Sequence, residues 1–274
     1  MVMPWRCLLP LKEKQADSNA GKTGNKQLKL LHMKICLVQT RSVKGNIEAN
    51  ITAHLHFIEL ALLKGAGMIV FPELSITGYE PGLASALAVS TEDARFNQFQ
   101  QISNRHTVII AIGVPVRINN GVSIGLLIFR PGREKTLYSK KYLHPDELPF
   151  FAGAENFSVL GGTDPLTAFA ICYEISVPAH AARAAAGGAA IYIASVAKTA
   201  TGMDKASQAM AAIAEKYSMT ALLVNCTGHC DNFESAGRSA VWNSKGMLMA
   251  QLDSEQEGIL LYNNKTGEVS IETA

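Results

Sequence analysis

The sequence predicts a single α/β domain whose strands form one mixed sheet or two sheets. Amphipathic helical segments alternate with short apolar strands from Lys34 onward, which is typical of an α/β fold. Turn signals such as Asn119-Asn-Gly121 also join neighbouring strands directly, which argues against a purely parallel sheet. The 274 residues are 48% hydrophobic and 18% charged, so the chain can build a large core and is not globally disordered.

The first 32 residues differ from the rest in composition. The stretch 12–29 is polar and lacks periodicity, so we expect residues 1–32 to be a flexible tail or leader. Residues 20–23 match half of a phosphate-binding loop, but its first glycine is missing and no strand precedes it. The folded domain is therefore expected to occupy residues 33–274.

The first half of the domain begins with an apolar strand at 34–39. Asn46 can cap the next helix, whose apolar residues follow helical spacing up to Gly65. The further elements expected in this half are a strand at 68–71, a helix at 91–105 and strands at 107–114, 122–129 and 135–139. A polar loop at 140–157 follows, and it is too long to be an ordinary connection.

The second half begins with an expected strand at 166–172 and an alanine-rich helix at 176–186, which ends at Gly187-Gly188. The remaining expected elements are a helix at 203–218 and strands at 189–195, 221–226, 239–242, 247–252 and 259–262. No internal repeat and no linker interrupts this pattern, which favours one domain.

Three of the expected strands place a reactive residue at their carboxyl end. Glu73 and Lys140 each follow a strand, and Cys172 ends one. Sites in open α/β sheets form at this edge, so the three side chains can converge. Cys172 also precedes a helix, whose dipole and free N–H groups favour a thiolate. A carboxylate in apolar surroundings can act as the base for a thiol, and a lysine can stabilise an oxyanion.

Each of these residues also has an ordinary structural interpretation when it is considered alone. A single cysteine is usually a small buried hydrophobe. A carboxylate after a strand often caps a helix or is solvated, and a lysine in a loop is usually exposed. Only the combination of the three indicates catalysis.

The three residues lie in motifs that resemble those of the nitrilase superfamily of carbon–nitrogen hydrolases. The stretch Phe71-Pro-Glu-Leu-Ser-Ile-Thr-Gly-Tyr79 is similar to the motif that carries the general base. Tyr138-Ser-Lys-Lys-Tyr-Leu143 is similar to the lysine motif, and Ile171-Cys-Tyr-Glu174 to the nucleophile motif. The resemblance spans about residues 33–262 with the motifs in order. It implies that Glu73 is the general base, Lys140 the catalytic lysine and Cys172 the nucleophile.

The resemblance also implies a fold and supporting residues. The fold is a four-layer α-β-β-α sandwich with two mixed β-sheets. Glu147 matches an acidic residue that lies near the thiol and the lysine, and the backbone N–H of Tyr173 would be a second oxyanion donor. Tyr79 and Glu174 are expected to support or line the pocket.

The function that follows from the resemblance is cysteine-dependent hydrolysis of non-peptide carbon–nitrogen bonds, without a cofactor or metal. The expected enzyme is an amidase that releases ammonia or an amine from a small amide through a thioester. A nitrilase and a non-catalytic ligand-binding relative remain alternatives. Tyr142 replaces the histidine of the lysine motif, Val177-Pro-Ala179 replaces Phe-Pro-Glu, and Glu174 stands where many amidases have aspartate. These departures concern the choice of substrate.

Two other motifs suggest different chemistry. Gly121-Val-Ser-Ile-Gly125 matches the G-x-S-x-G pattern of serine hydrolases, but a turn precedes it and β-forming residues follow, so we expect Ser123 within a strand. Cys226, His229 and Cys230 could bind a metal, but three such residues are too few for a closed zinc site. We therefore expect neither a serine nucleophile nor a metal.

Charge and cysteine content bear on partners and compartment. The net charge of +2 gives no footprint for nucleic acid or an anionic membrane, and no apolar run reaches the roughly 18 residues that span a bilayer. Five cysteines, an odd number, suggest reduced thiols and a cytoplasmic location. The resemblance implies a homodimer or a higher even oligomer, with close packing near the alanine-rich stretch 179–186.

Overall fold

The computed structural model describes residues 33–157 and 159–273, so the expected tail at 1–32 lies outside the described residues. In the first half the elements are β1 (Lys34–Gln39), α1 (Ile47–Leu63), β2 (Ala66–Val70), α2 (Ala84–Leu87), α3 (Asn97–His106), β3 (Ile109–Ile118), β4 (Gly121–Phe129) and β5 (Thr136–Ser139). In the second half they are β6 (Thr167–Ile171), α4 (Pro178–Ala186), β7 (Ile191–Val196), α5 (Ala200–Tyr217), β8 (Thr220–Asn225), β9 (Thr227–Cys230), β10 (Phe233–Ala236), β11 (Ala240–Trp242), β12 (Leu248–Gln251), β13 (Gly258–Asn263) and β14 (Val269–Thr273). Short 3-10 helices are η1 (Pro81–Leu83), η2 (Ala94–Phe96), η3 (Pro145–Glu147) and η4 (Cys172–Ser176).

Two large mixed sheets form the centre of the molecule. The seven-stranded sheet has the order β14-β13-β1-β2-β3-β4-β5. In it β1, β2 and β3 are parallel to one another, and the other neighbouring pairs are antiparallel. The five-stranded sheet has the order β12-β11-β8-β7-β6, with β6, β7 and β8 parallel. The strands β9 and β10 form a separate hairpin.

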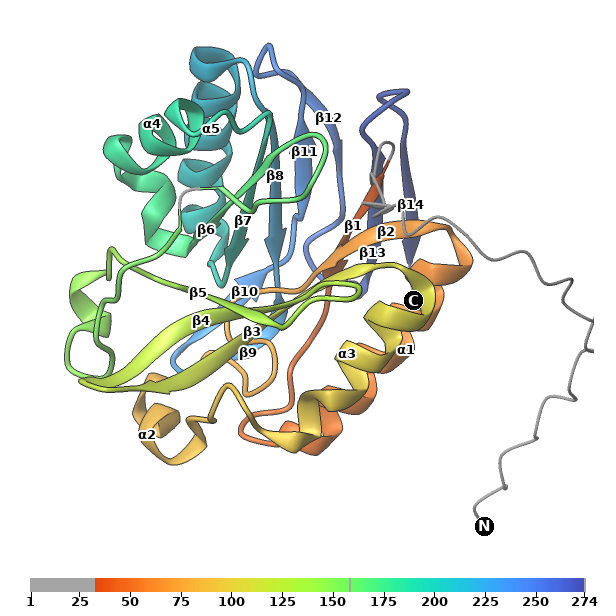
Figure 1. The fold of residues 1–274 in the computed structure, drawn as a ribbon. Helices are drawn as coiled ribbons and strands as arrows, with labels where there is room; N and C mark the ends of the chain where they lie inside the picture. The colour runs from red at the N-terminus through yellow and green to blue at the C-terminus, as the bar shows by residue number, and fades with distance from the viewer. Residues whose placement is uncertain (1–32, 158, 274) are drawn as a thin grey trace, which may run out of the picture.

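The layers follow from the alternation of apolar residues along the strands. In β1, Ile35 and Leu37 face the core between the sheets, whereas Cys36 and Val38 face the core beneath α1 and α3. Helices α4 and α5 cover the outer face of the five-stranded sheet (Figure 1). The prediction of an α-β-β-α sandwich with two mixed sheets is therefore confirmed.

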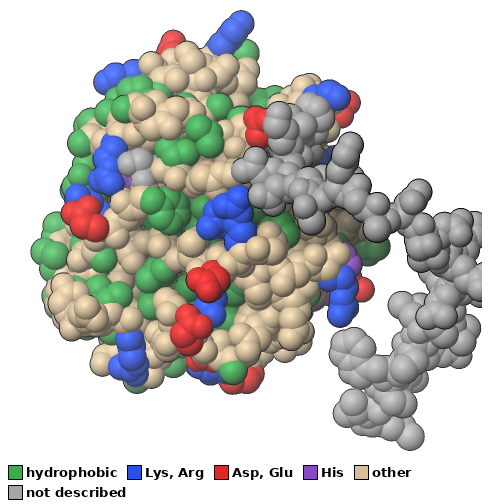
Figure 2. Space-filling model, viewed as in Figure 1, with side chains coloured by type: hydrophobic (Ala, Val, Ile, Leu, Met, Phe, Trp, Pro, Cys, Tyr) green, Lys and Arg blue, Asp and Glu red, His purple; other side chains and the backbone are tan. Residues whose placement is uncertain are grey.

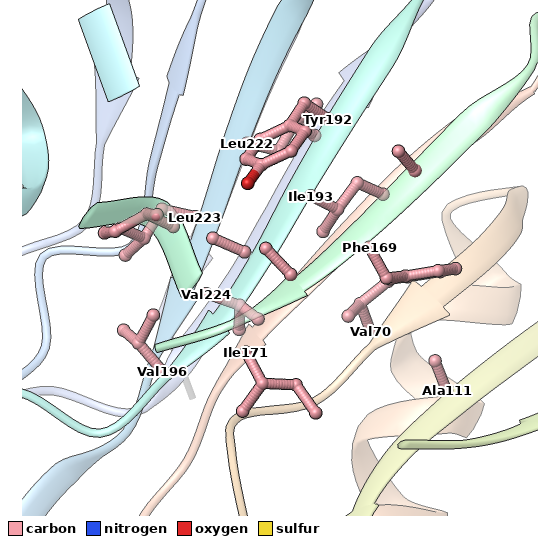
Figure 3. Close-up of a cluster of buried hydrophobic side chains, with 14 of the residues drawn as sticks. Val70, Ala111, Phe169, Ile171, Tyr192, Ile193, Val196, Leu222, Leu223 and Val224 are labelled. Atoms are coloured by element: carbon pink, nitrogen blue, oxygen red, sulfur yellow. The ribbon is translucent and has the colours of Figure 1, made fainter. Parts of the chain in front are cut away.

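The central core joins the two sheets. Figure 3 shows Val70 and Ala111 of the seven-stranded sheet near Phe169 of the five-stranded sheet, and all three belong to one buried cluster. The face of the molecule in Figure 2 carries charged side chains of both signs, interspersed with polar and apolar ones. Within the described residues, no helix has the length and apolar character needed to cross a membrane.

Local signals account for the helix boundaries. The side chain of Asn46 accepts a hydrogen bond from the backbone N–H of Ala49 at 3.1 Å, so the expected cap of α1 is present. The helix expected at 91–105 is shorter, because Asp93 caps the 3-10 turn η2 and α3 begins only at Asn97. Thr107, which was expected to start a strand, ends α3 in the left-handed conformation with φ 54°.

Several other boundaries differ from the sequence-based expectation. The expected strand 166–172 is β6, which ends one residue before Cys172, and the expected helix 176–186 begins at Pro178. The sequence did not indicate α2, the β9–β10 hairpin or β14. These elements are four or five residues long, which is too short to show a periodic pattern of apolar residues. In addition, β9 contains Gly228 with φ 83°, a residue that signals a turn rather than a strand.

Candidate active site

A buried ammonium group lies between two buried carboxylates. The Nζ atom of Lys140 is 2.8 Å from Oε1 of Glu73 and 2.6 Å from Oε1 of Glu147. All three residues are at most 2% exposed. Burial lowers the pKa of Lys140, but the charges of Glu73, Cys172 and Glu147 raise it by more, so the ammonium form is stabilised.

The Glu73 segment is held against the first half of β3. The backbone N–H of Phe71 donates to the carbonyl of Ala111 at 2.9 Å, and that of Ile76 donates to the carbonyl of Gly113 at 3.0 Å. A Cβ atom on Gly113 would lie 2.2 Å from the carbonyl oxygen of Pro72, so only glycine permits this approach. The position of Glu73 therefore depends on a glycine in the neighbouring strand.

Lys140 is held at the start of the long loop that follows β5. Its backbone N–H donates to the carbonyl of Ile124 at 2.8 Å, and its carbonyl accepts from the N–H of Ala154 at 3.2 Å. The backbone is thus fixed on both sides of the side chain. This arrangement directs the ammonium into the space between Glu73 and Glu147.

Cys172 is the first residue of η4 and follows directly after β6. Its φ of 44° is in the left-handed region, which is costly for a residue with a side chain. The Sγ atom lies 3.9 Å from the carbonyl oxygen of Ala197, and the residue is 9% exposed. The β6–η4 junction therefore turns the thiol sharply out of the strand direction.

Cys172 begins the short 3-10 helix η4, but its burial disfavours the thiolate. Burial and then the charge of Glu73 raise the pKa of the thiol to about 11, although Lys198 and Lys140 act in the opposite direction. The long helix α4 begins six residues later, at Pro178, so its dipole does not act directly on the sulfur. The thiol is therefore protonated at neutral pH and needs a base.

Glu73 has the properties of such a base. Burial raises the pKa of its carboxyl group; the charge of Lys140 lowers this pKa and that of Glu147 raises it. Oε1 accepts from Lys140, whereas the buried Oε2 has no hydrogen-bond partner among the described residues. An unpartnered carboxylate oxygen with a raised pKa is able to accept a proton.

The supporting residues occupy two different places. The hydroxyl of Tyr79 donates to Oε1 of Glu147 at 3.0 Å, which extends the charged cluster by one group. The ring of Tyr173 lies 5.3 Å from that of His144, in the same loop as Glu147. Tyr173 is the second residue of η4, where backbone N–H groups have no partner within the helix.

Glu174 does not join the charged cluster but connects the Tyr138 hydroxyl with two segments of backbone. Its Oε2 accepts from the Tyr138 hydroxyl at 2.7 Å and from the Ile171 N–H at 2.9 Å. Its Oε1 accepts from the Lys141 N–H at 2.8 Å. The fully buried carboxylate therefore ties the residue before Cys172 to the residue after Lys140, rather than lining a pocket.

One residue near the thiol was not singled out from the sequence. Lys198 follows β7, and its positive charge lowers the pKa of Cys172. Its N–H donates to Oδ1 of Asn225 at 3.0 Å, and its carbonyl accepts from the amide of the same side chain at 3.1 Å. No salt bridge of Lys198 is found within the part of the chain that the structure describes. No motif marks this lysine, because tertiary packing alone brings it near the sulfur.

The structure places the two competing motifs outside this arrangement. Ser123 lies within β4, pairs with Val116 of β3 and is fully buried, so it does not occupy a strand-to-helix turn. Cys226, His229 and Cys230 lie at and after the end of β8. Within residues 33–157 and 159–273, no group of three or more His, Cys, Asp or Glu side chains is arranged to hold a metal ion.

This fold, together with a thiol, a carboxylate and an ammonium group that are buried near one another, is the arrangement that the resemblance to the nitrilase superfamily implies. The chain belongs to the carbon–nitrogen hydrolase family, because the sequence model described as carbon-nitrogen hydrolase matches residues 34–269. The resemblance found in the motifs is thereby confirmed over most of the chain.

Characterised relatives share less than 30% of their residues with this chain over the aligned regions. The chain is 29% identical over 224 residues to the 2-oxoglutaramate amidase of Bacillus subtilis, a match that covers 79% of this chain and 84% of that protein. It is 26% identical over 245 residues to the glutamine-dependent NAD(+) synthetase of Aquifex aeolicus, covering 86% of this chain. The chain spans only 43% of the length of that synthetase.

The fold is also that of a solved amidase. A mutant of the amidase from Nesterenkonia sp. AN1 in complex with butyramide is similar with a TM-score of 0.77 and 23% identity. The match covers 85% of this chain and 91% of the amidase chain. At this level of identity the likeness establishes the shared fold.

Proposed function

We propose that the chain is a cysteine-dependent amidase that hydrolyses small amides through a thioester acyl-enzyme, with Cys172 as nucleophile, Glu73 as general base and Lys140 as catalytic lysine. The observation that carries the proposal is the unpartnered, buried Oε2 of Glu73 in a cluster with Lys140 and Cys172. Family membership and the amidase names among the relatives support the same reaction class.

The first half of the reaction forms the acyl-enzyme. Glu73 takes the proton of the Cys172 thiol while the sulfur attacks the amide carbon, and the electron pair of the carbonyl bond moves to oxygen. Lys140 and the N–H of Tyr173 stabilise this oxyanion. Glu73 then gives its proton to the amide nitrogen, the carbon–nitrogen bond breaks, and ammonia or an amine leaves.

The second half regenerates the thiol. Glu73 takes a proton from a water molecule, whose oxygen attacks the thioester carbon. The carbon–sulfur bond then breaks, the carboxylic acid product leaves, and the sulfur receives the proton held by Glu73. Because Glu73 alternates between base and acid in both halves, a raised pKa suits its task.

The surrounding groups hold this machinery in place. Glu147 binds the ammonium of Lys140 in addition to Glu73, and Tyr79 in turn donates a hydrogen bond to Glu147. Oε2 of Glu147 accepts from the N–H of His144 at 2.8 Å, so both carboxylate oxygens have partners. The lysine is thereby kept charged and oriented toward the place where the oxyanion develops.

The first substrates to test are small amides that carry a carboxylate. Lys198 brings a positive charge near Cys172 and has no carboxylate partner within the described residues. The relative from Bacillus subtilis is named for 2-oxoglutaramate, an amide of a dicarboxylic acid. Both observations support trying ω-amides before neutral amides, N-carbamoyl compounds and nitriles.

The proposal is tested by measuring ammonia release from these substrate classes. We expect turnover by the wild-type chain and a loss of about four orders of magnitude or more in Cys172→Ala, because the nucleophile is removed. Ser123→Ala is the matched control and is expected to be nearly silent. A thioester adduct on Cys172 should be visible by mass spectrometry of the intact protein.

Three results would contradict the proposal. Retained turnover in folded Cys172→Ala would exclude Cys172 as nucleophile, and a loss confined to Ser123→Ala would restore the serine mechanism. Binding of amides without any acyl-enzyme or ammonia would favour a non-catalytic ligand-binding relative. Faster release from nitriles than from amides would identify a nitrilase.

Assembly and location complete the proposal. We propose a homodimer or higher even oligomer that packs through α4, because Ala179, Ala182 and Ala186 are exposed on that helix and permit close approach. A monomeric mass by light scattering would contradict it. We also propose a cytoplasmic location, which the four free cysteines among the described residues support.

A further inference from the structure

We propose that Cys226 and Cys230 form a reversible disulfide on exposure to a peroxide, and that this bond lowers the activity of the neighbouring active site. The Sγ atoms of the two residues are 3.6 Å apart, and both residues are buried. Neither has a part in the proposed reaction. Only the effect on activity rests on the proposed function; the disulfide itself does not.

The two thiols are brought together by the start of the β9–β10 hairpin. Cys226 directly follows β8, and Cys230 ends β9, with Gly228 between them at φ 83°. A disulfide bond is about 2.05 Å long, so the sulfur atoms must approach by roughly 1.5 Å. Side-chain rotation of Cys226 and of Cys230, which ends a four-residue strand whose strand partner among the described residues is β10, can supply this movement.

The two thiols are chemically unequal. Hydrogen bonding from Cys230 lowers the pKa of Cys226, and Ser235, whose Oγ is 3.2 Å from the Cys226 sulfur, acts in the same direction. The interaction with Cys226, and then burial, raise the pKa of Cys230. Cys226 also has the Ser235 hydroxyl in contact with its sulfur, so we assign it as the thiol that reacts first with an oxidant and Cys230 as the one that resolves the product.

The reaction is balanced with one equivalent of hydrogen peroxide. The Cys226 thiolate attacks a peroxide oxygen, the oxygen–oxygen bond breaks, and the released hydroxide takes a proton to become water. The sulfur of Cys230 then attacks the resulting sulfenic acid, the sulfur–oxygen bond breaks, and a second water leaves. Two thiols are oxidised by two electrons in total, and a dithiol reductant reverses the reaction.

The pair is in contact with groups that touch the active site. Cys226 and Cys230 pack in one small cluster with Ala197, Tyr79 and Phe233. The carbonyl of Ala197 is the group 3.9 Å from the Cys172 sulfur, and the hydroxyl of Tyr79 donates to Glu147. Closing the disulfide shifts this cluster, and misplacement by about 1 Å can reduce a rate on the order of 100-fold.

The chemical test uses the full chain in a Cys172→Ala background, so that the proposed nucleophile cannot be oxidised. After treatment with hydrogen peroxide, free thiols are alkylated with iodoacetamide and the protein is digested with trypsin without reductant. Cys226 and Cys230 lie in the same tryptic peptide, 217–238. We expect this peptide to lose two hydrogen atoms and to carry no alkyl group.

Controls separate a disulfide from general oxidation. If dithiothreitol is added after the peroxide and before alkylation, the peptide should again carry two alkyl groups. In the Cys230→Ser variant, Cys226 should instead remain as a sulfenic acid that dimedone traps. Cys36, a buried thiol of β1 whose pKa is raised by burial, should stay reduced throughout. Two alkyl groups on peptide 217–238 after peroxide, or higher oxidation of both cysteines instead of the disulfide, would overturn the proposal.

The activity test compares the wild-type chain with the double variant Cys226→Ser, Cys230→Ser. We expect peroxide to lower ammonia release by at least about tenfold in the wild type, and dithiothreitol to restore it. The double variant should lose distinctly less activity under the same treatment. Equal losses in both proteins would overturn the link to the active site, because the damage would then lie at Cys172. If no amide is hydrolysed by untreated protein, the proposed function fails while the peptide result still decides the disulfide.

Discussion

Burial controls the protonation of the two side chains that begin the proposed reaction. It raises the pKa of Cys172 to about 11, so the thiol keeps its proton at neutral pH, and it also raises the pKa of Glu73. Lys140 counteracts both shifts, which keeps a carboxylate available although its surroundings are apolar. The proposed reaction therefore begins with proton transfer from a neutral thiol rather than with a preformed thiolate.

The first prediction at this scale concerns pH. Below its raised pKa Glu73 is protonated and cannot accept the thiol proton, so kcat/KM should fall roughly tenfold per pH unit on the acid side. Because the pKa of Glu73 lies above its ordinary value of 4.5, this fall should begin above that pH. The measurement is kcat/KM against pH with a small amide.

Glu147→Gln provides the control for this pH profile. The charge of Glu147 raises the pKa of Glu73, so its removal should move the acid limb to lower pH. An acid limb that stays in place would show that another group controls it. Glu73→Gln should remove turnover at every pH, because no base remains.

Single residues also show what the sequence could and could not reveal. Glu73, Lys140 and Cys172 were found because they occupy recognisable motifs at strand ends, and the structure brings their side chains into one cluster. The left-handed backbone and raised pKa of Cys172 could not be found, since both depend on packing around the β6–η4 junction. Their catalytic roles stay predictions until the variants are measured.

At the scale of elements, β3 acts as the support for the Glu73 segment. Gly113 allows Pro72 and Leu74 to lie against the strand backbone, and the N–H of Ile76 donates to its carbonyl. Neither the length of β3 nor its hydrophobicity indicates this role. The sequence therefore predicted most of the strand but not the reason for the glycine within it.

The prediction at this scale is that Gly113→Ala lowers kcat/KM by about 100-fold or more while the protein remains folded. The added Cβ would lie 2.2 Å from the Pro72 carbonyl oxygen and must displace the segment that carries Glu73. The measurement is kcat/KM for an amide, with thermal unfolding followed by circular dichroism. Gly82→Ala is the matched control, because its Cβ would meet nothing within 4 Å. Wild-type kcat/KM in Gly113→Ala would contradict the prediction.

Glu174 shows a second limit of sequence-based interpretation at the element scale. The residue was expected to support or line the pocket, and its carboxylate joins β5, the end of β6 and the loop after Lys140, contacts that the sequence did not indicate. A glutamate two positions after the nucleophile gives no sign of which backbone groups it will bind. Those partners are distant in the chain and are defined only by the packing of the two sheets.

At the scale of the whole molecule, the proposed site is divided between the two sheets. Glu73 and Lys140 follow strands of the seven-stranded sheet, whereas Cys172 follows β6 of the five-stranded sheet. The composition and the alternation of elements predicted the α/β class, and the motifs implied two sheets. The exact position of one sheet on the other depends on interlocking residues such as Val70, Ala111 and Phe169, which no local pattern specifies (Figure 3).

This division predicts that activity is lost before the fold. In rising urea we expect ammonia release to disappear at a lower concentration than the far-ultraviolet circular dichroism signal. A small relative movement of the sheets separates the thiol from its base while the strands of each sheet stay paired. Substrate at saturating concentration in both measurements serves as the control for ligand stabilisation. Coincident transitions in the two measurements would contradict the prediction.

The pairing of β1 with β13 has a consequence for synthesis on the ribosome. Lys34 pairs with Asn263, so one edge of β1 has no strand partner until nearly the whole domain has been translated. Until then the nascent chain presents unpaired N–H and C=O groups along an apolar strand, which is the kind of edge that associates with other chains. Both edges of β1 can therefore be paired only after translation of residues 258–263, and early release of the chain would leave an aggregation-prone product.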